Sequence, residues 1–194
     1  ALKRIISDFS AMPLHVDKSR PAFAVCAVMT QIRLFEDVFL ELQDEFGPIE
    51  YFGKIYRFDY TDYYNKEMGK NLHKQIAAFK NFREPHCLAE IKKRTLAIEE
   101  RWATSDTAAN LRRRANIDPG ILSESTLLLA TTKYGRHRVG IAPGMYAEIT
   151  LMYEKGRYRK QPWTYIDYQS EEMQSFLLTL RTDLLTRRRS NVKH

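Results

Sequence analysis

An uninterrupted apolar run, Ala22–Met29, constrains the fold of this chain more than any other stretch. The run has the length of a strand, and its apolar residues do not alternate with polar ones. A continuous apolar strand is typical of a sheet that is covered on both faces. The sequence therefore predicts that this segment is a strand buried on both of its sides.

Predicted helices and strands alternate after this run. Residues 31–46 place their apolar side chains on one helical face, and Gly47-Pro48 is a typical helix stop. A second helix with a buried stripe is expected from Pro85 to Trp102. Further strands are predicted at residues 49–58, 74–82 and 113–117. The order β-α-β-β-α-β predicts an α+β fold with a ferredoxin-like core sheet.

The remaining residues are expected to extend this core. Ser123 is suited to cap a short helix that ends at Thr132. Residues 138–141 and 146–153 predict a C-terminal β-hairpin, and residues 170–188 predict a terminal helix. The predicted organisation is an N-terminal arm (1–20), a single α+β domain (21–189) and a basic tail (190–194).

Composition limits the classes of partner and compartment. No apolar run approaches the roughly 18–20 residues of a membrane span, so no membrane partner is expected. The two cysteines, Cys26 and Cys87, fit a reducing cytoplasm, and Cys26 is expected to be a buried thiol. A net charge of +7 favours anionic partners. The basic residues cluster at 112–114, 136–138, 157–160 and 187–189, although each cluster is equally compatible with a solvated surface.

Motifs of familiar catalytic classes are missing from the sequence. Its glycines do not form a P-loop, and there is no G-x-S-x-G nucleophile elbow. The histidines do not have the spacing of a structural zinc site. An ordinary GTPase is therefore not expected.

Three residues remain as candidate catalytic groups, each with a plain structural alternative. Asp118 is predicted at the end of a strand, where ligands often bind, or it caps a turn at Pro119-Gly120. His137 is either an acid or phosphate contact, or an exposed hairpin residue. Glu148 faces solvent if its strand is covered on one side, whereas on a doubly covered sheet it needs a cation or a metal as partner.

Carboxylates and tyrosines suggest two further kinds of contact. Asp59, Asp118 and Glu148 together present oxygen ligands that suit a divalent cation such as Mg²⁺. Tyrosines are concentrated between Tyr51 and Tyr64. Such rings can stack on bases, but packing in strands and loops is the expectation that we favour.

A series of short segments occurs in order along the chain: FDYTDYYNKEMG from Phe58, NIDPG from Asn116, LATTK from Leu129, His137-Arg138, YAEITL from Tyr146 and PWTYIDY from Pro162. The series resembles the prokaryotic domain-of-unknown-function family 4416 from Ala22 to the last helix. The resemblance implies no activity. One departure is the hairpin turn, usually Gly-Asp-Gly in the family and here Ala142-Pro143-Gly144, so any role of an acid at that turn is absent or relocated.

These observations favour a cleft that binds a phosphorylated or other anionic, nucleotide-like ligand, with or without a divalent metal. If the protein is an enzyme, the expected chemistry is metal-assisted reaction of a phosphate ester or nucleotide. The alternatives are a nucleic-acid-binding module that uses arginines and tyrosines, or a subunit that docks an acidic protein. The sequence leaves the oligomeric state open. The expected ligand-binding residues are Arg112, Arg114, Asn116, Lys133, Arg136, Tyr64 and Glu67.

Overall fold

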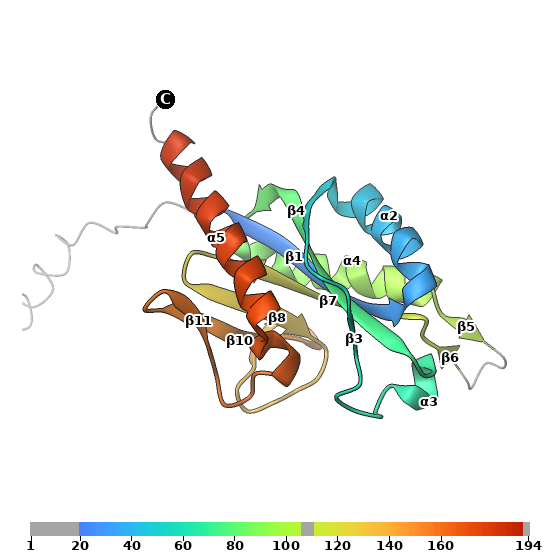
Figure 1. Ribbon diagram of the computed structural model, residues 1–194. Coiled ribbons are helices and arrows are strands. Elements are labelled where there is room, and N and C mark those ends of the chain that lie inside the picture. Colours follow the sequence, from blue (N-terminus) through green and yellow to red (C-terminus); the bar gives the residue numbers. More distant parts are fainter. Residues whose placement is uncertain (1–19, 106–110, 192–194) are drawn as a thin grey trace, which may run out of the picture.

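The computed structural model describes residues 20–105 and 111–191, and it is a mixed α+β protein with one large antiparallel sheet (Figure 1). Within the described residues the sheet has nine strands, and its main path runs β11-β10-β8-β7-β1-β4-β2. The strands of this path are β1 (Ala22–Gln31), β2 (Ile49–Phe52), β4 (Leu72–Arg83), β7 (Ala115–Leu122), β8 (Thr126–Thr131), β10 (Met145–Glu154) and β11 (Arg157–Lys160).

Shorter elements complete the described fold. Strand β3 (Tyr56–Arg57) pairs with β4 and β9 (Val139–Ala142) pairs with β10, while β5 (Thr104–Ser105) and β6 (Leu111–Arg112) pair separately. The helices are α2 (Phe35–Phe46), α3 (Asn65–Met68), α4 (Leu88–Arg101) and α5 (Glu171–Asn191), with 3₁₀ helices η1 (Ile32–Leu34), η2 (Pro85–Cys87) and η3 (Ile166–Gln169). None of the helices in the described ranges is long and apolar enough to cross a membrane.

The central strand β1 is buried on both faces, as its apolar run predicts. Ala24, Cys26 and Val28 pack into the core that α2 and α4 cover, whereas Phe23 and Val25 pack into the core that α5 covers. Successive side chains of a strand point to opposite faces, so a strand covered on both sides is apolar throughout. Figure 1 shows α5 on the opposite side of the sheet from α2 and α4. Cys26 is a buried free thiol, as expected.

Local chemistry explains where the first helix ends. Val38, Phe39 and Leu42 form its buried stripe. Gly47 follows with φ of +92°, and its N–H donates to the carbonyl of Gln43 at 2.8 Å. A positive φ is readily adopted only by glycine, so the helix stops at the predicted place.

The predicted ferredoxin-like topology is not confirmed, although the α+β class is. The sheet has nine strands within the described residues, and its order continues through β8, β10 and β11. The predicted strand 49–58 is divided into β2 and β3, and both pair with β4.

The predicted helix from Ser123 to Thr132 is wrong, because this segment forms strand β8. The Ser123 hydroxyl accepts hydrogen bonds from the N–H groups of Ser125 (3.1 Å) and Thr126 (2.9 Å). Ser123 therefore closes the tight turn between β7 and β8 instead of capping a helix. A short apolar run fits either structure, and pairing with β7 and β10 decides for the strand.

The C-terminal part agrees more closely with the sequence prediction. Strands β9 and β10 form the predicted hairpin around Pro143-Gly144, and β11 adds a further strand. The terminal helix α5 extends to Asn191, so the first residues of the predicted basic tail are helical. The rest of that tail, and the N-terminal arm up to residue 19, lie outside the described residues.

Candidate ligand-binding site

A cavity of about 470 Å³ lies where β7 and β8 diverge. The two strands pair only from Gly120, opposite Leu129, to Leu122. Before Gly120, β7 keeps its pairing with β1 but has no partner on β8 within the described residues. The cavity is lined from both sides of the sheet, by α4, by the aromatic segment 58–64 and by residues 165–168.

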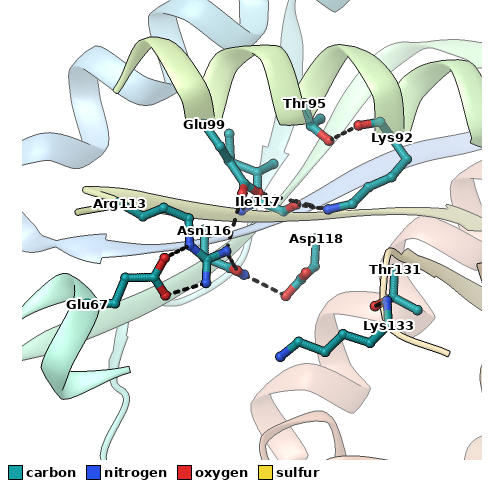
Figure 2. Close-up of polar contacts among 10 residues, drawn as sticks. All are labelled: Glu67, Lys92, Thr95, Glu99, Arg113, Asn116, Ile117, Asp118, Thr131 and Lys133. Atoms are coloured by element: carbon teal, nitrogen blue, oxygen red, sulfur yellow. Dashed lines mark hydrogen bonds and ion pairs between the residues drawn. The ribbon is translucent and has the colours of Figure 1, made fainter. Parts of the chain in front are cut away.

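Helix α4 supplies hydrogen-bond partners to backbone groups of β7 that have no partner on β8. The N–H of Ile117 donates to the Glu99 carboxylate at 2.7 Å, and the Ile117 carbonyl accepts from Lys92 Nζ at 3.0 Å (Figure 2). Buried backbone groups need such partners, because leaving them unpaired costs free energy. Lys92 and Glu99 are both buried, and their charged groups lie 3.9 Å apart. Burial raises the pKa of Glu99, an effect that Lys92 opposes.

Asp118-Pro119-Gly120 lies inside β7, so the predicted turn at this point is wrong. Asp118 pairs with Ala27 in the middle of the sheet. Pro119 has no N–H to donate, and it occupies the position where pairing with β8 stops. A Cβ atom on Gly120 would lie 2.4 Å from the Leu128 carbonyl oxygen, so glycine permits the close approach of β8. These residues shape the divergence of the strands and do not form a turn.

Arg113 holds one end of the cavity together. Its guanidinium donates to both carboxylate oxygens of Glu67, at 2.7 Å for the Nη2 bond, and it lies 3.4 Å from Glu99. The hydrogen bonds to Glu67 raise the pKa of Arg113 above its ordinary value. Arg113 also donates to Asn116 Oδ1 at 3.0 Å. The Asn116 amide nitrogen therefore faces Asp118, and it donates to Asp118 Oδ2 at 3.0 Å.

Glu148 is buried, with 4% of its surface exposed, so the solvent-facing alternative is wrong. It accepts from Arg138 Nε at 2.8 Å, and His137 Nε2 lies 3.1 Å from the same oxygen. The His137 ring stacks on Trp163 with its centre 4.7 Å away. Because helices cover both faces of the sheet, this carboxylate needs a cation, and Arg138 supplies it.

Asp167 forms a second buried ion pair at the cavity. It lies 2.6 Å from Lys74 Nζ and accepts from the Tyr56 hydroxyl at 2.9 Å. The neighbouring Tyr168 is almost fully buried, and its hydroxyl has no hydrogen-bond partner among the described residues. Burial and the charge of Asp167 keep the pKa of Tyr168 well above its ordinary value, so the phenol remains a hydrogen-bond donor.

Lys133 is the cation at this site that contacts rings instead of carboxylates. Its Nζ lies 4.5 Å from the centre of the Tyr63 ring and 5.9 Å from that of Tyr64. It also lies 3.5 Å from the Tyr63 hydroxyl. Figure 2 shows Lys133 and Asp118 extending toward the same space, and both line the cavity.

Burial, with a contribution from the Asp118 charge, raises the pKa of Tyr64 to about 12.

The structure brings together part of the predicted site. The lining residues include Tyr64, Asn116, Asp118, Lys133 and Glu148. Two more predicted residues do not line the cavity but contact a residue that does. Glu67 accepts from Arg113, and His137 contacts Glu148. The other predicted residues do not line the cavity: Asp59 pairs with Arg57 at 3.8 Å, Arg114 stacks on Trp102, and Arg112 and Arg136 are exposed.

The predicted metal ligands are not gathered at one point. Asp118 and Glu148 line the cavity, but Asp59 does not, and its side chain is 66% exposed. Within the described residues, no three His, Cys, Asp or Glu side chains are close enough together to hold a metal ion.

Several lining residues were not predicted from the sequence. Lys92 and Glu99 lie on the same helical face as the predicted stripe residues Leu88 and Thr95, at spacings of three and four residues. Charged residues inside an apolar stripe are a signal that could have identified them. Arg138, Asp167 and Tyr168 lie in segments that resemble the family, but no pattern in those segments indicates that these three residues line a site, and Lys74 has no such signal. Long-range packing places all four at the cavity.

The fold and site define a mixed α+β protein with a charged, tyrosine-lined cavity at a divergence of two strands. The family described as Domain of unknown function (DUF4416) matches residues 20–184, and the chain belongs to this family, as its sequence segments indicate. Comparison with curated proteins gave no match, and neither did comparison with solved structures.

Proposed function

We propose that the cavity binds a small phosphorylated ligand of nucleotide-like size. The proposal rests on one observation, the position of Lys133 at the cavity with tyrosine rings as its contacts. An ammonium group so placed is available for a phosphate, because a charge-assisted hydrogen bond is stronger than a contact with a ring.

The other charges of the cavity support this assignment. Its described lining contains five cationic side chains and four carboxylates. Internal pairs account for most of them: Lys74 with Asp167, Lys92 with Glu99, Arg138 with Glu148, and Arg113 with Glu67 outside the lining. After these pairs, Lys133 and Asp118 remain for a ligand.

The size and the aromatic content of the cavity fit a ligand with a planar ring. A volume of about 470 Å³ lies within the usual range of small-molecule sites. Phe58, Tyr60, Tyr63 and Tyr64 line one side, and aromatic side chains stack on bases. A nucleoside monophosphate has both of the required parts, an anionic group and a ring.

The proposal concerns binding and does not assign a reaction. His137 and Glu148 are not assigned catalytic roles, because Arg138 and His137 already engage Glu148 and His137 does not line the cavity. Asp118 is assigned to ligand binding. Several arginines of the predicted basic clusters are ion-paired, namely Arg113, Arg157, Arg187 and Arg188. Their pairing favours a small ligand over a nucleic-acid surface.

The test is equilibrium binding of nucleoside monophosphates and of the corresponding nucleosides, measured by calorimetry. Lys133→Gln keeps most of the side chain and removes its charge. We expect about tenfold weaker binding of the monophosphate, the equivalent of one charge-assisted hydrogen bond, and unchanged binding of the nucleoside. Lys155→Gln is the control, since Lys155 is 82% exposed in the turn after β10. Equal affinity of Lys133→Gln and the wild type, or no binding of any monophosphate, would refute the proposal.

A further inference from the structure

Asp118 differs from the other carboxylates of the cavity in having no cationic partner within the described residues. Glu99, Glu148 and Asp167 each lie within 4 Å of a lysine or arginine. From the part of the chain that the structure describes, Asp118 receives only the amide hydrogen bond of Asn116. Carboxylates away from solvent are normally paired, so a half-buried one in a cavity is suited to accept hydrogen bonds from a ligand.

The surroundings fix Asp118 as an acceptor. Glu67 holds one edge of the Arg113 guanidinium through two hydrogen bonds, and Arg113 donates to the side-chain amide oxygen of Asn116. This bond leaves the amide N–H of Asn116 directed at one oxygen of Asp118. The second carboxylate oxygen and the remaining lone pairs are left for N–H groups, since an ionised carboxylate only accepts.

A second, independent feature lies at the same cavity. Tyr168 lines it, and its buried hydroxyl has no partner among the described residues. A buried hydroxyl without a hydrogen-bond partner costs free energy, and an oxygen atom of a ligand could accept its hydrogen bond. Its pKa is raised by burial, then by the charges of Asp167 and Asp118, which keeps the hydroxyl a donor.

We infer that the ligand is a guanine nucleotide, with two adjacent N–H donors of the base on Asp118 and the neighbouring carbonyl oxygen on the Tyr168 hydroxyl. This inference rests on the proposed function, because the phosphate of the same ligand would bind Lys133. Guanine presents N1–H and N2–H side by side, next to O6. A carboxylate matches two parallel donors, as it does when it binds a guanidinium group.

The other common bases fit Asp118 less well. Adenine and cytosine place a ring-nitrogen lone pair beside their amino group, and this lone pair would face a carboxylate oxygen. Uracil places a carbonyl oxygen on each side of its single N–H, with the same consequence. A site built to bond N–H groups rejects a ligand that lacks them, because its own polar groups are then left unpaired.

The experiment compares guanosine, inosine, adenosine and uridine monophosphates on the full chain by calorimetry. Inosine monophosphate lacks only the N2 amino group, so it tests the second donor without any change to the protein. We expect it to bind about tenfold more weakly than guanosine monophosphate, and adenosine and uridine monophosphates more weakly still. Asp118→Asn should abolish the difference in affinity between guanosine and inosine monophosphates. Lys133→Gln should instead weaken the binding of all four ligands to a similar extent.

Tyr168→Phe separates a ligand contact from a structural role. It removes an unpartnered hydroxyl and keeps the ring, so the melting temperature of the free protein should not fall, whereas affinity for guanosine monophosphate should. Equal binding of all four monophosphates would overturn the inference and leave the proposed function standing. Absence of binding by all four would overturn both. A guanosine preference that Asp118→Asn leaves intact would also refute the assignment of Asp118.

Discussion

Gly120 is a residue of β7 to which β8 lies close. A Cβ atom there would lie 2.4 Å from the Leu128 carbonyl oxygen and 2.8 Å from a Leu129 methyl carbon. We expect Gly120→Ala to lower the free energy of unfolding by about 1–3 kcal/mol, because the backbone must shift to relieve the overlap. Urea unfolding monitored by circular dichroism measures this change. Gly140→Ala is the control, since nothing lies within 4 Å of its Cβ position, and equal stability of the two variants would contradict the explanation.

A residue of the site can be identified from the sequence when its type is unusual for its position. Glu148 lies in an alternating strand, and its carboxylate needs a cationic partner if both faces of the sheet are covered. Both faces are covered, and Arg138 is that partner. Asp118 is predicted either as a ligand contact at a strand end or as the cap of a turn. It lies inside β7 and no turn exists there, yet its side chain lines the cavity. Lys74 and Asp167 could not be predicted in this way, because residues 93 positions apart meet only through the packing of the final fold.

Helix α4 takes the place of a missing strand along part of β7, and this contact depends on a buried ion pair. Lys92→Met leaves the Glu99 carboxylate without its lysine and the Ile117 carbonyl without its donor. We expect a loss of about 3 kcal/mol in unfolding free energy, as for other buried pairs that lose one partner.

A second substitution tests whether charge causes this loss. Glu99→Gln removes the carboxylate charge, which in Lys92→Met retains only Arg113 at 3.4 Å, and keeps an oxygen that can accept from the Ile117 N–H. The free energy of unfolding of the double variant should therefore exceed that of Lys92→Met by about 1 kcal/mol or more. Urea unfolding of the wild type, both single variants and the double variant gives the coupling. Strict additivity of the two single changes would show that Glu99 does not depend on Lys92.

Elements with a complete local pattern are predicted well, whereas a segment whose pattern fits both a helix and a strand is decided by its pairing. The stripe of α2 and the stop at Gly47 follow from periodicity and from one backbone angle. Residues 126–131 are a short apolar run that fits a helix or a strand, and only the neighbours β7 and β10 determine the outcome. The divergence of β7 from β8, which creates the cavity, is a property of two strands together, so neither strand's sequence predicts it alone.

At the scale of the whole molecule, the net charge of +7 does not by itself indicate a nucleic-acid surface. Arg157 pairs with Glu171, Arg187 with Glu50 and Arg188 with Glu124. Paired arginines have less positive potential to offer a phosphate backbone. The ammonium of Lys133, which has no carboxylate partner among the described residues, lies instead at a cavity that would hold a single small ligand.

The salt dependence of binding distinguishes these two kinds of partner. A ligand with one phosphate on Lys133 should lose affinity only shallowly as salt rises, with a log–log slope of about −1 or smaller in magnitude. A surface that contacts six to ten phosphates would lose about 10³–10⁵ in affinity between roughly 50 and 200 mM salt. We expect the shallow slope for guanosine monophosphate, and no tighter binding of a short single-stranded oligonucleotide, both measured by fluorescence anisotropy competition.

The variant with Arg159→Gln and Lys160→Gln is the control, since these exposed residues of β11 belong to a predicted basic cluster outside the cavity. It should leave the affinity for guanosine monophosphate unchanged, whereas a steep slope and tighter binding of the oligonucleotide, both lost in this variant, would identify a nucleic-acid-binding protein instead.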